Sequence, residues 1–147
     1  MDPRRVVRSV RMLHRLVTAE PSPNEQAVVE AMADRVTEVV DDDGSVSTDG
    51  KVIHITGRNR LYGNSVTFAP FTILRALPGE EGVLAACESL GTTLRRFLGD
   101  CGEPWPSADA APHVLLTDET INVWWGGPTE ADASARLRPF SRQELGL

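Results

Sequence analysis

The chain begins with two segments whose apolar residues recur at helical spacing, which indicates two amphipathic helices. The first is predicted over residues 3–19 and the second over residues 23–40. The second starts at Ser22-Pro23-Asn24-Glu25, where Ser22 can cap the helix and Glu25 completes a capping box. Only a few residues connect the two segments, so we expect an antiparallel helical hairpin. The apolar positions are Val6, Val10, Leu13 and Val17 in the first segment and Val28, Met32, Val36 and Val39 in the second.

After residue 44 the apolar pattern changes to the alternation that is typical of β-strands. Asp49-Gly50 is predicted to turn the chain between the first two of three strands. Helical spacing returns over residues 80–98, and two further strands meet at the tight turn Asp118-Glu119. A last short helix is predicted over residues 129–137, and a capping box at residues 141–144 predicts a terminal turn. The predicted strands cover residues 45–48, 51–56, 65–69, 113–117 and 120–125, and residues 70–77 stay unassigned.

This order of elements predicts an α+β fold in one domain, residues 1–147. An N-terminal antiparallel helical hairpin should precede a mostly antiparallel five-stranded sheet of order β-β-β-α-β-β, with helices packed mainly on one face and a short helical C-terminal tail. The order resembles that of type III secretion chaperones and related small binding domains over about two-thirds of the chain. The resemblance is one of topology, it involves no sequence motif, and the leading helix departs from it.

Composition and charge exclude several classes of function. With a net charge of −6, the chain is a poor candidate for general nucleic-acid binding, because phosphates need a positive field. No apolar run approaches the roughly 20 residues that span a bilayer. No signal peptide is recognisable either, so neither a membrane span nor secretion is expected. The two cysteines do not make a disulfide framework, which favours a reduced, cytoplasmic protein.

The sequence also lacks the motifs that most often carry chemistry. It contains no G-x-S-x-G elbow, no Walker A loop and no G-x-G-x-x-G fingerprint. His14, His54 and His113 have no His or Cys partner at metal-ligand spacing. The run Asp41-Asp42-Asp43 lacks the acidic spacing of a calcium loop. We therefore expect no metal and no cofactor, and we favour a non-enzymatic role.

Four arginines form a stripe along the polar face of the first predicted helix. This stripe can meet an acidic protein partner. It can equally be a solvated face, or it can relieve the aspartates 41–43 at the end of the second helix, where acidic groups oppose the helix dipole. The stripe consists of Arg4, Arg8, Arg11 and Arg15.

Trp124 and Trp125 are adjacent in a predicted strand and must point to opposite faces of the sheet. Trp125 shares a face with Ile121 and Val123, which we take as the core face. Trp124 shares the other face with Asn122. If helices cover only one side of the sheet, Trp124 is either exposed as an anchor for a partner or covered by the C-terminal tail. The apolar residues of that tail are Leu137, Phe140, Leu145 and Leu147.

We interpret the chain as a small intracellular protein-interaction module without catalytic activity. It could act as an immunity-type inhibitor, a secretion-chaperone-like factor or an assembly subunit. Its partner would be a protein or a second copy of the chain, through a sheet face or edge. The alternative is a small-molecule or anion-binding domain, or an enzyme, with a pocket between sheet and helices. The residues of that alternative are His54, Arg58, Arg60 and Tyr62, three of them in a loop that can equally be a polar hairpin connection.

Overall fold

The computed structural model describes residues 20–40, 44–58, 63–102 and 110–147 of the chain, without the side chain of Arg58. The first predicted helix, and with it the helical hairpin, lies outside these residues. The described helices are α2 (Pro23–Val39), α3 (Pro70–Ala76), α4 (Glu80–Asp100) and the 3-10 turn η1 (Glu130–Asp132). The strands are β1 (Ser45–Thr48), β2 (Ile53–Arg58), β3 (Gly63–Phe68), β4 (Pro112–Leu116), β5 (Thr120–Gly126), β6 (Ala133–Arg136) and β7 (Phe140–Ser141).

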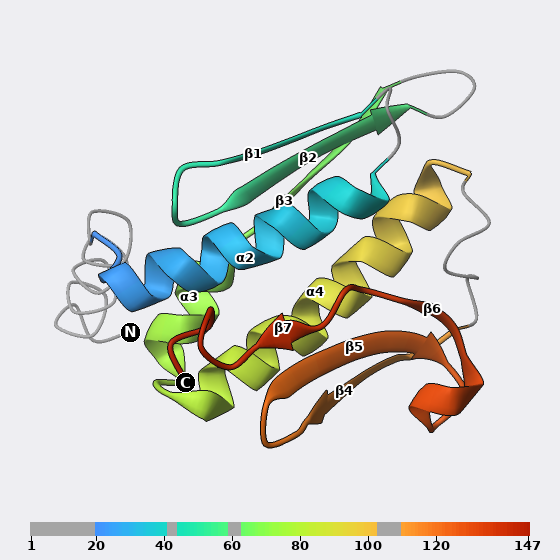
Figure 1. Cartoon of the computed structure of the whole chain (residues 1–147). Coiled ribbons are helices and arrows are strands. Elements are labelled where there is room, and N and C mark those ends of the chain that lie inside the picture. The colour runs from blue at the N-terminus through green and yellow to red at the C-terminus, as the bar shows by residue number, and fades with distance from the viewer. Residues whose placement is uncertain (1–19, 41–43, 59–62, 103–109) are drawn as a thin grey trace, which may run out of the picture.

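The fold is α+β, but its strands form two antiparallel sheets in place of the expected five-stranded sheet. The first sheet has the order β1-β2-β3, and the second has the order β4-β5-β6 with β7 also paired to β5. The helices α2 and α4 run between the two sheets (Figure 1). Helix α4 packs against β3 on one side and against β4 and β5 on the other. Two sheets form because the helical layer is apolar on both sides, so that each sheet can bury its own inner face against it.

Helix α2 begins as the sequence predicts. The side chain of Ser22 accepts a hydrogen bond from the backbone N–H of Glu25 at 3.2 Å, and the Glu25 carboxylate accepts one from the N–H of Ser22 at 2.8 Å. These two bonds are the capping box. The helix buries more than the predicted stripe, since Val29, Ala33 and Arg35 are buried as well.

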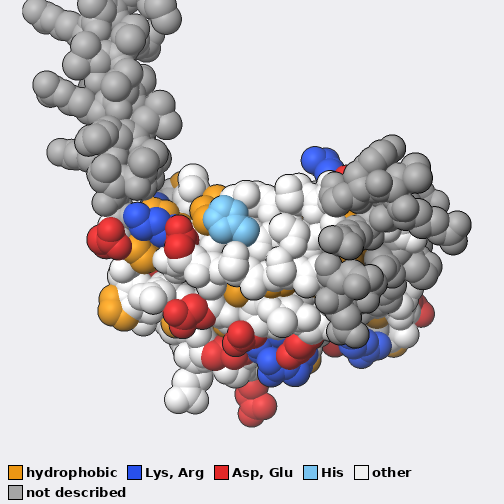
Figure 2. Space-filling model, turned by 90° about the horizontal axis from the view of Figure 1, so that it is seen from above, with side chains coloured by type: hydrophobic (Ala, Val, Ile, Leu, Met, Phe, Trp, Pro, Cys, Tyr) orange, Lys and Arg blue, Asp and Glu red, His pale blue; other side chains and the backbone are white. Residues whose placement is uncertain are grey.

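The first sheet has an apolar inner face and a hydroxyl-rich outer face. Ile53 and Ile55 are completely buried. The outer face carries Ser45, Ser47, His54, Thr56, Ser65 and Thr67, which the register places in adjacent rows. Figure 2 shows this side of the molecule, on which the area around a histidine is mostly free of charged side chains. Charged side chains gather elsewhere, so this face offers hydroxyl groups and little charge.

The β1–β2 connection is longer than the predicted two-residue turn, because β2 starts at Ile53. Asp49 organises this loop by accepting hydrogen bonds from the N–H groups of Lys51 and Val52 at 2.9 and 3.0 Å. The bonds from Val52 and Lys51 favour the carboxylate and lower the pKa of Asp49 below its ordinary value. Gly50 adopts a positive φ of 89° in the same loop, a conformation that glycine adopts without strain.

The second sheet contains the predicted hairpin of β4 and β5, but the helix predicted over residues 129–137 is wrong. The chain makes the short turn η1 and then enters β6, which pairs with β5. The sequence here alternates with period two: Ala135 and Leu137 are buried, whereas Ser134 and Arg136 are exposed. Strand β7 continues along the edge of β5 that β6 occupies. The expected short helical tail is therefore a strand segment that ends in a hydrogen-bonded turn.

Gly126 makes this return of the chain possible. Its φ is +121°, and a Cβ atom at this position would lie 2.8 Å from the backbone nitrogen of Ser134. A side chain would therefore push β6 away from β5. The hydroxyl of Ser134 donates to the carbonyl oxygen of Trp125 at 3.1 Å and closes the junction.

One cluster of buried apolar side chains extends through both sheets and the helices between them. Trp125 is completely buried in it, and its indole N–H donates to the carbonyl oxygen of Gly91 in α4 at 3.0 Å. Cys87 and Leu90 of α4 lie in the same cluster. Among the described residues, no helix combines the length and hydropathy that a bilayer crossing requires.

Candidate functional site

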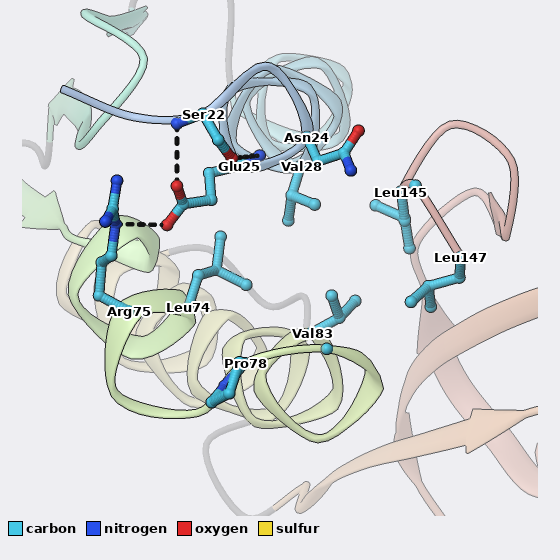
Figure 3. Close-up of a pocket in the computed structure, with 12 residues that line it drawn as sticks. Ser22, Asn24, Glu25, Val28, Leu74, Arg75, Pro78, Val83, Leu145 and Leu147 are labelled. Carbon is cyan, nitrogen blue, oxygen red and sulfur yellow. Dashed lines mark hydrogen bonds and ion pairs between the residues drawn. The ribbon is translucent and has the colours of Figure 1, made fainter.

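A recess lies where the start of α2, the α3–α4 junction and the C-terminal segment meet. We call it the groove; its volume is about 430 Å³. Figure 3 shows its side chains converging from these three parts of the chain. The wall is mixed. Its polar or charged side chains are Ser22, Asn24, Glu25 and Arg75, and its apolar side chains are Val28, Leu74, Pro78, Val83, Leu145 and Leu147.

The charged side chains of the groove are already engaged in the structure. Glu25 accepts the capping bond from Ser22 through one carboxylate oxygen and forms an ion pair with Arg75 Nε at 2.8 Å through the other. Arg75 also donates to the carbonyl oxygen of Glu20 at 2.8 Å, and its guanidinium lies 5.1 Å from the ring centroid of Phe71. The arrangement holds α3 against the start of α2 and presents no unpaired charge from these two residues to a ligand.

Arg35 positions the C-terminal side of the groove from within α2. Its side chain is 1% exposed and donates to the carbonyl oxygens of Arg138 at 3.0 Å and Pro139 at 2.9 Å. It also pairs with the Glu144 carboxylate, and its guanidinium lies 4.6 Å from the ring centroid of Phe140. These contacts anchor the turn that places Leu145 and Leu147 on the groove wall (Figure 3).

Glu144 completes this anchor with the predicted capping box at residues 141–144. Its carboxylate accepts from the N–H of Ser141 at 2.9 Å, while the hydroxyl of Ser141 accepts from the N–H of Glu144 at 3.1 Å. Sequence reasoning found this box but missed its partner Arg35. The available signal was a charged residue between the buried Ala33 and Val36 of α2.

Trp124 lies on the outer face of the second sheet, as predicted, and its own chain covers it. It is 4% exposed. The ring of His113 stacks on it with the centroids 5.3 Å apart, and the indole N–H donates to the carbonyl oxygen of Gly127 at 3.1 Å. Trp124 is therefore covered by His113 and the β5–β6 turn. Phe140 and Leu145 of the C-terminal tail, which was the predicted cover, lie in the core instead.

Asn122, on the same face as Trp124, is tied to the β5–β6 turn as well. Its amide nitrogen donates to a carboxylate oxygen of Glu130 at 3.1 Å. Its amide oxygen is buried, and no hydrogen-bond partner for it exists among the described residues. Asn122 therefore helps to hold the turn over Trp124, and the structure does not bring either residue to the groove.

The residues of the ligand-binding alternative are not brought together in the described part of the chain. His54 is exposed on the outer face of the first sheet, where its Nδ1 lies 3.1 Å from the hydroxyl of Thr67. Arg58 ends β2, and its side chain is not described. Arg60 and Tyr62 lie outside the described residues, as do Arg4, Arg8, Arg11 and Arg15 of the predicted arginine stripe.

Cys87 of α4 is a buried free cysteine. Burial raises the pKa of the Cys87 thiol to about 12, so this thiol is neutral at physiological pH and a poor nucleophile. Among residues 20–40, 44–58, 63–102 and 110–147, no group of three His, Cys, Asp or Glu side chains could hold a metal ion. The groove offers a partner both apolar contacts and the polar side chain of Asn24.

Comparisons with protein-family models, with curated proteins and with solved structures find no match for this chain. The resemblance to type III secretion chaperones therefore stays a prediction from element order. What the chain does has to be argued from the groove and the surfaces described above.

Proposed function

We propose that this chain is a protein-binding module and that the groove receives an apolar segment of its partner. The observation that carries the proposal is that the charged side chains of the groove are paired with each other, whereas its apolar side chains are available for contact. The charged pair Glu25 and Arg75 is satisfied internally, and six apolar side chains line the groove beside it together with Ser22 and Asn24. A partner therefore gains free energy by burying apolar atoms.

The volume of the groove supports a few inserted side chains. About 430 Å³ lies within the range of roughly 300–1,000 Å³ that binding pockets occupy. A small polar substrate needs several unpaired polar groups to orient it. Glu25, Arg75 and Ser22 are committed to other contacts, which leaves the amide of Asn24. One or two aliphatic side chains on a partner segment fit this chemistry better. An inhibitor, a chaperone-like factor and an assembly subunit would each use such a site.

The test is selection from a random peptide library displayed on phage against the immobilised protein, followed by affinity measurement with synthetic peptides. We expect enriched peptides that share an aliphatic anchor. The variant Leu147→Arg places a charge on the groove wall at a partly buried side chain, and its expected effect is about a tenfold or greater loss of affinity, because one lost anchor is worth roughly 1.5–3 kcal/mol.

Leu115→Arg is the matched control, since Leu115 is 46% exposed on β4 and does not line the groove. This variant should bind the selected peptides with unchanged affinity. Circular dichroism and thermal melting confirm that both variants are folded. Equal affinity of the two variants, or enrichment of no aliphatic peptide at all, contradicts the proposal.

A further inference from the structure

Among the described residues, one edge of strand β3 pairs with no other strand, and β3 itself lacks the usual protection against strand pairing. All of its residues pair with β2 in regular antiparallel register, and no described strand pairs with its other edge. Natural proteins protect such edges with charges, prolines or bulges. The segment Gly-Asn-Ser-Val-Thr-Phe of β3 contains none of these. The edge strand β4 of the second sheet begins with Pro112, whereas β1, at the other edge of the first sheet, is like β3 in having no charge and no proline.

A shallow recess of about 170 Å³ accompanies this edge. It lies between β3 and one side of α4. The side chains of α4 that line it are Thr93, Arg96, Phe97 and Asp100, which follow one another at helical spacing. Arg96 and Asp100 are exposed, and neither forms an ion pair with another described residue. The edge of β3 thus has room beside it and two unpaired charges of opposite sign.

We infer that a second copy of this chain docks here, so that the β3 strands of two copies pair antiparallel about a twofold axis. With the axis at Val66, Ser65 lies opposite the partner's Thr67, and Val66 lies opposite the partner's Val66. Cross-strand hydroxyl pairs and β-branched pairs are favourable in antiparallel sheets. The two three-stranded sheets then form one continuous sheet.

The charges on α4 are self-complementary under the same symmetry. A twofold axis reverses the direction of α4 in the partner, and Arg96 and Asp100 are one helical turn apart. Arg96 then faces the partner's Asp100, and Asp100 faces the partner's Arg96. The same patch supplies both halves of the interface, as an isologous dimer requires. This inference uses β3 and α4 and stands apart from the groove.

Sedimentation velocity across the micromolar range tests the inference, with the wild-type chain expected to dimerise reversibly. The double variant Ser65→Lys/Thr67→Lys places like charges opposite each other across the dimer. It should raise the dissociation constant about tenfold or more, because like charges directly opposite are destabilising. The matched control Ser45→Lys/Ser47→Lys adds the same charge to the same outer face on β1. This control should dimerise as the wild type does.

A charge reversal supplies a second readout that does not depend on the strand. Arg96→Asp and Asp100→Arg should each weaken the dimer, and the double variant Arg96→Asp/Asp100→Arg should restore it. A wild-type monomer throughout the range overturns the inference. So does a dimer that responds equally to the β1 and β3 lysine variants. Peptide binding to the groove is measured in a separate experiment, so either proposal can fail without affecting the other.

Discussion

Arg35 is the buried charge on which the junction between α2 and the C-terminal segment depends. Its donors satisfy two backbone carbonyls and a carboxylate, so the charge is compensated where water is excluded. Losing such a side chain costs more than losing an exposed one, because its partners stay behind without replacement bonds. The position therefore contributes stability and also shapes the groove wall.

We predict that Arg35→Met lowers the free energy of unfolding by about 2–4 kcal/mol. Two backbone carbonyl oxygens lose their donor at roughly 1–3 kcal/mol each, whereas the Glu144 side chain, which is 34% exposed, can be solvated. The measurement is urea denaturation followed by circular dichroism. Arg138→Met is the matched control, because Arg138 is half exposed in its 2.8 Å ion pair with Glu38. That exposed pair should contribute less than about 1 kcal/mol. Equal losses in the two variants would show that Arg35 has no special role.

Helix α4 meets the α3–α4 junction at Gly82. A Cβ atom at this position would lie 1.7 Å from the carbonyl oxygen of Leu77, so only glycine fits. Near the other end of the same helix, Gly99 has nothing within 4 Å of the corresponding position. The same Gly→Ala substitution therefore measures the effect of close packing at Gly82 and the effect of helix propensity at Gly99.

We expect Gly82→Ala to destabilise the protein by about 1–3 kcal/mol, because the backbone of the junction must move. Gly99→Ala should raise stability by up to about 1 kcal/mol, because alanine costs less backbone entropy in a helix. Thermal unfolding of both variants checks these opposite signs. A stabilising Gly82→Ala would mean that the junction yields easily and does not position Leu74 and Pro78 on the groove.

At the scale of elements, sequence reasoning succeeded where the deciding interactions are local. The start of α2 follows from Ser22 and Glu25, and α4 follows from its apolar spacing. It failed for β6, because the alternating segment 133–137 is short and rich in alanine. Its pairing with β5 is what makes it a strand. Residues 70–77 stayed unassigned because Phe71, Ile73 and Leu74 suit a buried strand as well as a helix.

The candidate site was less predictable than the elements. The groove joins residues near Ser22, Leu74 and Leu145, and no local pattern relates these segments. Trp124 was placed on the correct face of its strand, but its cover by His113 depends on the β4–β5 register. The number of sheets could not be predicted from local sequence patterns either, because it depends on which strands each face of α2 and α4 contacts.

At the scale of the whole molecule, one apolar cluster links the two sheets through the helices between them. Ile55 in the first sheet and Trp125 in the second both belong to this cluster and are fully buried. We therefore predict that the described elements unfold together as one cooperative unit. A chain of this size commonly unfolds in two states.

Ile55→Ala tests this prediction and should cost about 2–5 kcal/mol, the usual loss for a buried isoleucine. In a Trp105→Phe background, the remaining tryptophans are Trp124 and Trp125 of the second sheet. The denaturation midpoint should fall by the same amount whether it is followed by circular dichroism or by the fluorescence of these two residues. The conservative variant Ile55→Val should shift both midpoints together by a smaller amount. A fluorescence midpoint that does not move would show that the two sheets unfold independently.

The distance in sequence between Arg35 and its carbonyl partners affects how the chain folds while it is being synthesised. Arg35 is separated from the backbone of Arg138 by 103 residues. While the ribosome makes the intervening elements, α2 is complete but its buried charge has no acceptor, and β5 lacks the strands β6 and β7 along one edge. Long-range contacts of this kind form late and slow folding. Part of the apolar surface of α2 and β5 therefore stays uncovered in the nascent chain until residues 133–141 have been translated.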